Sequence, residues 1–188
     1  PHCRGCRKIL ASRPMVQLIQ PSTKSASDRR FGIVAARFNA EITEAMLDGA
    51  VQVLQDAGVS ESAIEVARVP GAFELPIACR SMARSGRFDA VIALGCVIRG
   101  ETPHFDFVAA EAARGCMQLG LETGVPVVFG VLTTDTLPQA RHRAVPELRS
   151  GSDGGTEGDA EKITPRSNKG AEAAAVALEM SALLEEIR

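Results

Sequence analysis

The sequence predicts an α/β protein: a four-stranded parallel sheet with helices on both faces, forming three layers. Four short, largely apolar segments alternate with segments of helical periodicity along the chain. That alternation is typical of parallel strands joined by right-handed helical crossovers, which distribute the helices over both faces. The chain has 188 residues, of which 45% are hydrophobic and 23% charged, as expected for one globular domain with a buried core.

The first half of the domain contains two strand–helix pairs. Residues 31–38 are a nearly continuous apolar run, as expected of a strand buried on both faces. Residues 42–57 repeat apolar side chains with helical spacing and end at Gly58, a common helix stop. A second strand is predicted at 64–69 and the next helix at 73–83.

The second half continues the same alternation. Residues 90–98 are the most apolar strand candidate, and a helix is predicted to follow at 105–121. A fourth strand is predicted at 125–132 and a short helix at 137–148. A long terminal helix, rich in Ala and Leu, is predicted at 169–188.

Two segments are expected to lie outside the regular core. Residues 150–167 are rich in Gly, Ser, Asp and Glu, so we expect an inserted polar surface loop at about 146–167. Residues 1–29 are expected to be a flexible basic tail ahead of a single domain at 30–188. The tail is either a solvated segment of a cytoplasmic protein or the remnant of a transit peptide, which would place the protein in a plastid.

Composition and cysteine spacing argue against nucleic-acid, membrane and metal partners. The net charge is -2, and no apolar run approaches the roughly 18 residues that span a bilayer. Cys3 and Cys6 form a CxxC pair, but no second pair follows to complete a zinc site. Cys79, Cys96 and Cys116 lie in apolar segments and are interpreted as buried thiols.

Candidate site residues gather where the predicted strands end. Ligands of an open parallel sheet bind outside the carboxyl ends of its strands. Here those ends are followed by Phe38 and Asn39, by residues 70–74, by residues 98–104 and by residues 133–135. We therefore expect these four segments to meet in space.

The third of these segments offers an anion site beside a titratable group. Gly100, Glu101 and Thr102 precede a helix, so backbone N–H groups and a hydroxyl can converge on an anion there. His104, in the first turn, has the chemistry of a general acid and base near neutral pH. A plain turn followed by a helix-start histidine explains the same residues, and this alternative stays open.

The other candidate site residues indicate a function only when they are considered together. Phe38 and Phe73 follow strands, where a planar heterocycle could stack on them, although most such residues belong to a core. Glu74 lies at a helix start, where the dipole favours a carboxylate in any case. Arg143 and Lys169 are basic residues near helix ends, and either could be ordinary surface charge.

Five ordered motifs together resemble the 6,7-dimethyl-8-ribityllumazine synthase family. They are RFNAEIT (37–43), VPGAFELP (69–76), GCVIRGETPHFDF (95–107), VPVVFGVLTTDT (125–136) and NKGAEAA (168–174). The resemblance covers roughly residues 30–145 and 168–188 and implies a flavodoxin-like three-layer sandwich.

The resemblance also implies a reaction in riboflavin biosynthesis. 5-Amino-6-(D-ribitylamino)uracil condenses with 3,4-dihydroxy-2-butanone 4-phosphate to give 6,7-dimethyl-8-ribityllumazine, phosphate and water, with no metal or redox cofactor. Members of the family assemble into pentamers or shells of pentamers, with sites between subunits. Riboflavin synthase is a candidate partner.

Site roles follow from the resemblance residue by residue. His104 is implied as the proton shuttle, and Arg143 as a catalytic residue that holds the phosphate together with Gly100, Glu101 and Thr102. The pocket for the pyrimidine and its ribityl chain is implied to include Phe38, Ala72, Phe73, Glu74, Val97 and Ile98. Phe129, Arg143 and Lys169 are expected from the neighbouring subunit.

The polar insert is the main departure from the family pattern. It separates Arg143 from Lys169 by 26 positions, which leaves open whether the two residues still meet. Two alternatives therefore remain beside the enzyme. One is a non-catalytic descendant that binds flavin or lumazine or forms a shell, and the other is a flavodoxin-like electron carrier, which the absence of Trp and Tyr disfavours.

Overall fold

The computed structural model describes residues 18–21, 26–144 and 168–187. Its four strands are Phe31–Ala36 (β1), Ile64–Val69 (β2), Ala90–Ile98 (β3) and Val127–Thr134 (β4). All pairings are parallel, in the order β2-β1-β3-β4. The predicted four-stranded parallel sheet is confirmed.

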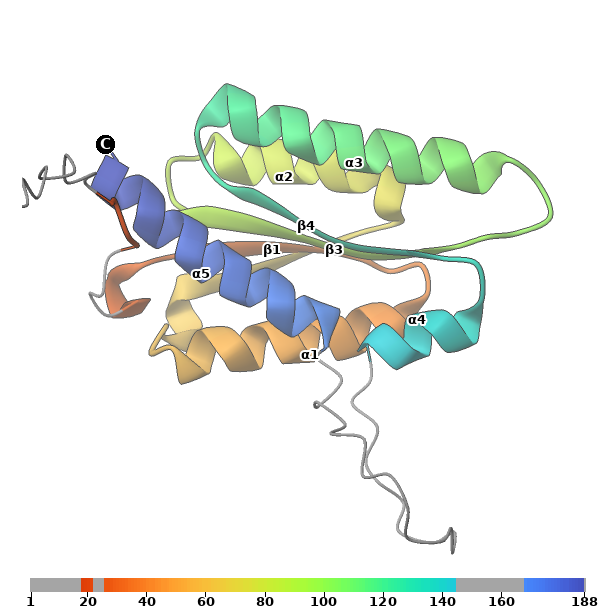
Figure 1. Ribbon diagram of the computed structural model, residues 1–188, viewed down its shortest axis with the longest axis horizontal. Coiled ribbons are helices and arrows are strands. Elements are labelled where there is room, and N and C mark those ends of the chain that lie inside the picture. Colours follow the sequence, from red (N-terminus) through yellow and green to blue (C-terminus); the bar gives the residue numbers. More distant parts are fainter. Residues whose placement is uncertain (1–17, 22–25, 145–167, 188) are drawn as a thin grey trace, which may run out of the picture.

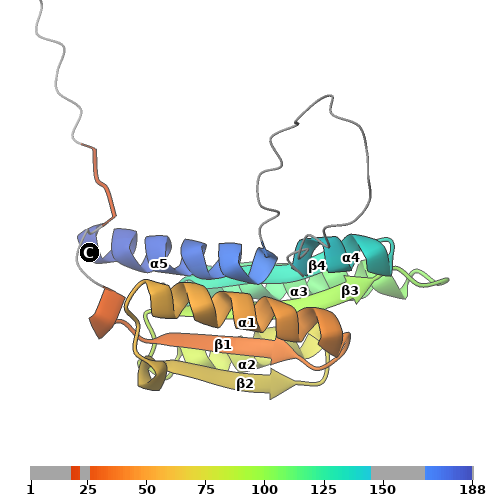
Figure 2. The ribbon, with the colours of Figure 1, turned by 90° about the horizontal axis from the view of Figure 1, so that it is seen from below.

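Helices cover both faces of the sheet. They are Ala40–Asp56 (α1), Leu75–Ala83 (α2), His104–Thr123 (α3), Leu137–Ala144 (α4) and Lys169–Ile187 (α5). Figure 1 shows α2 and α3 on one face and α1, α4 and α5 on the other. Viewed from below in Figure 2, α5 lies beside α1 on the same face of the sheet.

Two apolar cores result, one on each side of the sheet. Ile33 and Leu94 face α1 and α5, whereas Val34 and Ala93 face α2 and α3. Every residue of β1 is buried, because this strand is central and covered on both faces. That is the physical reason for its unbroken apolar sequence.

The element boundaries differ from those predicted by a few residues. β4 starts at Val127 rather than at residue 125, because Gly124 ends α3 in a left-handed conformation and Pro126 still belongs to the connection. The helix predicted at 73–83 begins as a 3₁₀ turn, Ala72–Glu74, before α2. α1 starts at Ala40, two residues ahead of the predicted start at 42.

The expected tail and insert fall largely outside the described residues. The Cys3/Cys6 pair, most of the tail and residues 145–167 are among those not described. Residues 26–29, however, pack on the domain: Ala26–Asp28 forms a 3₁₀ turn, and the Arg29 guanidinium lies 2.7 Å from a Glu185 carboxylate oxygen. Within the described ranges, no helix is long and apolar enough to cross a membrane.

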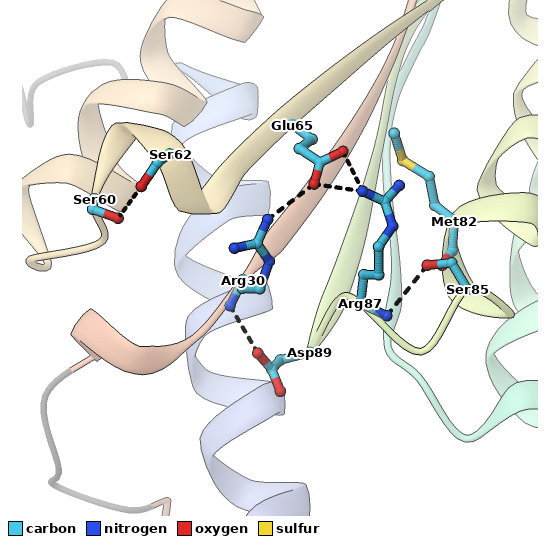
Figure 3. Close-up of polar contacts among 8 residues, drawn as sticks. All are labelled: Arg30, Ser60, Ser62, Glu65, Met82, Ser85, Arg87 and Asp89. Atoms are coloured by element: carbon cyan, nitrogen blue, oxygen red, sulfur yellow. Dashed lines mark hydrogen bonds and ion pairs between the residues drawn. The ribbon is translucent and has the colours of Figure 1, made fainter.

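A polar network ties the amino ends of three strands together (Figure 3). Arg30 and Arg87 both donate to the Glu65 carboxylate, at 3.0 and 2.7 Å. The Asp89 carboxylate accepts the Arg30 backbone N–H at 2.7 Å. Charged side chains therefore join β1, β2 and β3 at the end of the sheet opposite to the strand ends where a ligand would bind.

Candidate active site

A pocket of about 580 Å³ lies outside the carboxyl ends of β1 and β3, on the face covered by α2 and α3. Its walls come from three segments that are distant in sequence: Phe38, residues 71–74 and residues 96–108. Residues 133–135, which were expected to meet them, are not part of the lining. Nine predicted site residues line it: Phe38, Ala72, Phe73, Glu74, Val97, Ile98, Gly100, Thr102 and His104. The structure thus brings most of the predicted site into one cavity.

The turn after β1 presents Phe38 to this pocket. Asn39 adopts a left-handed conformation, with φ 57° and ψ 48°, which Asn tolerates better than most residues. Its side-chain amide donates to the Cys96 carbonyl at 2.9 Å, so the turn is fixed to β3. Phe38 remains 70% exposed, which leaves its ring free to stack on a ligand.

The segment after β2 forms the second wall. Glu74 accepts the Gly71 backbone N–H through Oε2 at 2.9 Å, closing a tight turn around Ala72 and Phe73. Phe73 is 58% exposed beside the cavity. One Glu74 oxygen is therefore engaged in the turn, and the other is available to accept a hydrogen bond from a ligand.

The loop between β3 and α3 supplies the polar part of the pocket. It extends beyond the sheet in both views (Figures 1 and 2). A Cβ placed on Gly100 would meet nothing within 4 Å, so the backbone there is open to a ligand. His104 is the first residue of α3 and is exposed, which puts its imidazole at the positive end of the helix dipole.

Arg99, which the sequence analysis did not single out, holds this loop at its base. Its guanidinium donates to both carboxylate oxygens of Asp106, at 3.0 and 3.3 Å, and to Asp135 at 3.0 Å. It also stacks over the Phe105 ring, 4.1 Å from the centroid. These carboxylates raise the pKa of Arg99, the hydrogen bond to Asp106 contributing most. In the sequence, the position of this arginine directly before the Gly-Glu-Thr turn was the feature that could have identified it as part of the site.

Four predicted residues do not line the pocket within this chain. Glu101 belongs to the same loop but is not part of the lining. Phe129 lies on the edge strand β4 and is 39% exposed. Arg143 on α4 donates to the Gln139 carbonyl at 2.9 Å, and Lys169 pairs with Glu172 at 2.5 Å, both on the face opposite to the pocket.

Asn168 keeps the two basic residues close despite the insert. Its amide donates to the Ala144 carbonyl at 2.6 Å and to the Ala45 carbonyl at 2.7 Å. Its oxygen accepts the Gly170 N–H at 2.8 Å and caps α5. Arg143 precedes Ala144, and Lys169 follows Asn168, so the helix ends that carry them are joined. In the sequence, the available signal was an asparagine, a common N-cap residue, directly before the predicted helix.

The cysteine in the pocket is a wall residue rather than a nucleophile. Burial raises the pKa of the Cys96 thiol to about 11, which leaves little reactive thiolate near neutral pH. Across the described residues, no group of three or more His, Cys, Asp or Glu side chains could hold a metal ion. The pocket offers aromatic surface, backbone donors, the Thr102 hydroxyl, the Glu74 carboxylate and the His104 imidazole as its chemical resources.

Comparison with known proteins is consistent with these features. Residues 28–185 match the family model described as 6,7-dimethyl-8-ribityllumazine synthase. A curated protein of that name from Desulfatibacillum aliphaticivorans is 46% identical over 166 residues, which is 88% of this chain and 96% of the relative. The match spans the whole sheet and both layers of helices.

Proposed function

The chain belongs to the 6,7-dimethyl-8-ribityllumazine synthase family, and we propose that the pocket beside His104 is where it performs the family's reaction. The chain is thus a transferase of riboflavin biosynthesis. It condenses 5-amino-6-(D-ribitylamino)uracil with 3,4-dihydroxy-2-butanone 4-phosphate. The main support for this position of the active site is that nine predicted site residues, scattered in sequence from Phe38 to His104, line one cavity.

The chemistry divides into steps that the pocket residues can serve. The pyrimidine amine adds to the ketone, and loss of water gives an imine. Phosphate is then eliminated, and the second nitrogen closes the ring with loss of a second water. Each step moves a proton to or from a nitrogen, an oxygen or a carbon, which is the task of a titratable group beside the reacting atoms.

His104 is proposed as that proton shuttle. It is exposed at the start of α3, next to the loop that would hold the phosphate. The N–H groups of Gly100, Glu101 and Thr102 have no acceptor within the described part of the chain. They can therefore bind phosphate oxygens at the helix start, as anion sites in α/β proteins do.

The pyrimidine is proposed to stack on Phe38, with Val97 and Ile98 forming the pocket wall. Ala72 and Phe73 line the part of the pocket next to Glu74. The free oxygen of Glu74 would accept hydrogen bonds from ribityl hydroxyls. Holding two substrates in one orientation supplies about 7–11 kcal/mol, so positioning contributes more than any single proton transfer.

Phe129, Arg143 and Lys169 are proposed to complete the pocket of a neighbouring subunit. β4 is an edge strand, and Phe129 is exposed on it. On α3, Met117 and Leu121 are 67% and 80% exposed, which is unusual for a surface helix left in water. These apolar residues support self-association, which in this family gives pentamers or shells of pentamers.

A direct turnover assay tests the function. The purified protein is mixed with the aminouracil and the butanone phosphate, and the absorbance of the lumazine is followed against an enzyme-free control. We expect turnover well above the spontaneous condensation. A folded, assembled protein that gave only the background rate would contradict the enzyme and favour a binding role.

A further inference from the structure

We propose that Arg99 is a positioning residue that fixes the phosphate-binding loop, without itself touching the phosphate. The inference rests on the proposed function, because it names the group that orders the loop of that same site. Arg99 ends the β3 side of the loop, and His104 begins α3 on the other side. Residues 100–103 span the gap, and Gly100, Glu101 and Thr102 carry the backbone N–H donors.

The Arg99 side chain closes this loop at two points. Its fork reaches forward to both oxygens of Asp106, in the first turn of α3. Its Nε reaches sideways to Asp135, just after β4. The Arg99 backbone N–H donates to the Thr134 carbonyl at 2.9 Å, which fixes the base of the loop to the sheet. The loop is thereby tied to α3 and to β4 at once.

The arrangement differs from an isolated surface ion pair, which contributes little because its side chains are free to move. The guanidinium is planar, binds Asp106 with two nitrogens and lies over the Phe105 ring at 4.1 Å. Only arginine combines a rigid fork with a flat face that stacks on an aromatic ring. Lysine in its place keeps the charge and loses this geometry.

Charge explains why Arg99 acts by position rather than as a ligand. It faces two carboxylates, Asp106 and Asp135, so its positive charge is already offset. Without Arg99, both carboxylates would lie unpaired beside an anion site. The Arg99→Lys substitution leaves the total charge unchanged, so any loss of phosphate binding that it causes reports geometry.

The test compares Arg99→Lys with Arg87→Lys as a matched control. The Arg87 guanidinium also binds a carboxylate, that of Glu65 (Figure 3). It lies over the Phe88 ring, 4.8 Å from the centroid. It does so at the opposite end of the sheet. Steady-state kinetics give kcat and both KM values, and titration calorimetry gives the affinity for inorganic phosphate.

We expect Arg99→Lys to raise the KM for the butanone phosphate and the Kd for inorganic phosphate by about three- to tenfold, in keeping with the loss of several exposed polar contacts. The KM for the aminouracil and kcat should change less than about twofold, because those contacts lie outside the loop. Arg87→Lys should leave both phosphate constants unchanged.

Two results would overturn the proposal. One is an Arg99→Lys variant with wild-type phosphate constants. The other is an equal loss on both substrates, which would mark a general structural role. Failure of the proposed function looks different, because wild-type protein would then show no turnover. In that case the Kd for inorganic phosphate would still test Arg99. The role of Arg99 would be contradicted if wild-type protein and Arg99→Lys bound phosphate equally well, or if neither bound it.

Discussion

At the scale of residues, the site depends on a few side chains that shape the backbone rather than touch a ligand. Asn39 turns the chain after β1, and Glu74 closes the turn after β2. Arg99 ties down the loop after β3. The groups proposed to meet substrate, such as Phe38 and His104, are exposed because these turns present them.

Replacing His104 by Ala should give a slow enzyme rather than a dead one. Proton transfer by a positioned side chain contributes roughly 10²–10⁴-fold, so turnover should fall by about that factor. Orientation of the two substrates would remain and keep the rate above background. Single-turnover absorbance measurements check this, with His142→Ala on α4 as the unaffected control. Complete loss of activity in an assembled variant would contradict the assignment.

Cys96 should resist alkylation in the folded protein. Its pKa of about 11 lies about three units above pH 8, so only about one thiol in a thousand is ionised at that pH. Treatment with iodoacetamide followed by peptide mass spectrometry should show slow labelling of Cys96 in native buffer and fast labelling in urea. Rapid labelling in native buffer would show that the thiol is exposed.

At the scale of elements, the sequence defined strands better than it defined contacts between distant segments. Apolar runs located β1 and β3 because both strands are buried on two faces. The rule that ligands bind at strand ends pointed to three of the pocket's segments, and the family resemblance implied its individual residues, including Val97. Arg99 and Asn168 were missed because their partners, Asp135 and Ala144, are brought near only by folding. Their positions beside a turn and before a helix were visible in the sequence, but these distant partners were not.

The crossing of α1 and α5 should tolerate no side chain at Gly170. A Cβ there would lie 1.9 Å from the Met46 carbonyl oxygen, which belongs to rigid helix backbone. Gly170→Ala should therefore destabilise the fold by about 1–3 kcal/mol, as overpacking does.

Gly120 on α3 is the matched control, since the atoms nearest to a Cβ placed there lie 3.7 Å away. Gly120→Ala should be neutral or gain up to about 1 kcal/mol. Urea unfolding compares the two variants, and equal midpoints would refute the close crossing.

The Glu65 network should contribute to stability only above the acid range. Hydrogen bonds from Arg87, and then from Arg30, hold the pKa of Glu65 below its usual value (Figure 3). The unfolded chain therefore takes up this proton at higher pH than the folded chain does. The contribution is complete above the ordinary carboxyl pKa and disappears as pH falls through the lower folded value.

Glu65→Gln should consequently lower the urea midpoint at pH 7 and have less effect near pH 3. Glu61→Gln, which changes an exposed carboxylate on the preceding 3₁₀ turn, serves as control. A difference between wild type and Glu65→Gln that persisted unchanged into acid would contradict the linkage.

At the scale of the whole molecule, the proposed site is divided into two parts, which lie on opposite faces of one chain. The pocket with His104 lies on the α2/α3 face, and Arg143 and Lys169 lie on the face of α4 and α5. Asn168 holds Ala144, so the two basic helix ends stay together across the insert. Head-to-tail association would bring the second surface of one subunit against the pocket of the next.

Mixed oligomers of two strongly impaired variants test this sharing of sites most directly. His104→Ala and Arg143→Ala chains are co-expressed with different tags, and assemblies carrying both tags are purified. If each site takes His104 from one subunit and Arg143 from the next, about a quarter of the sites in a random mixture regain both residues. We predict about a quarter of wild-type turnover, far above either parent. Turnover no higher than the average of the two parents would show that the site does not lie between subunits.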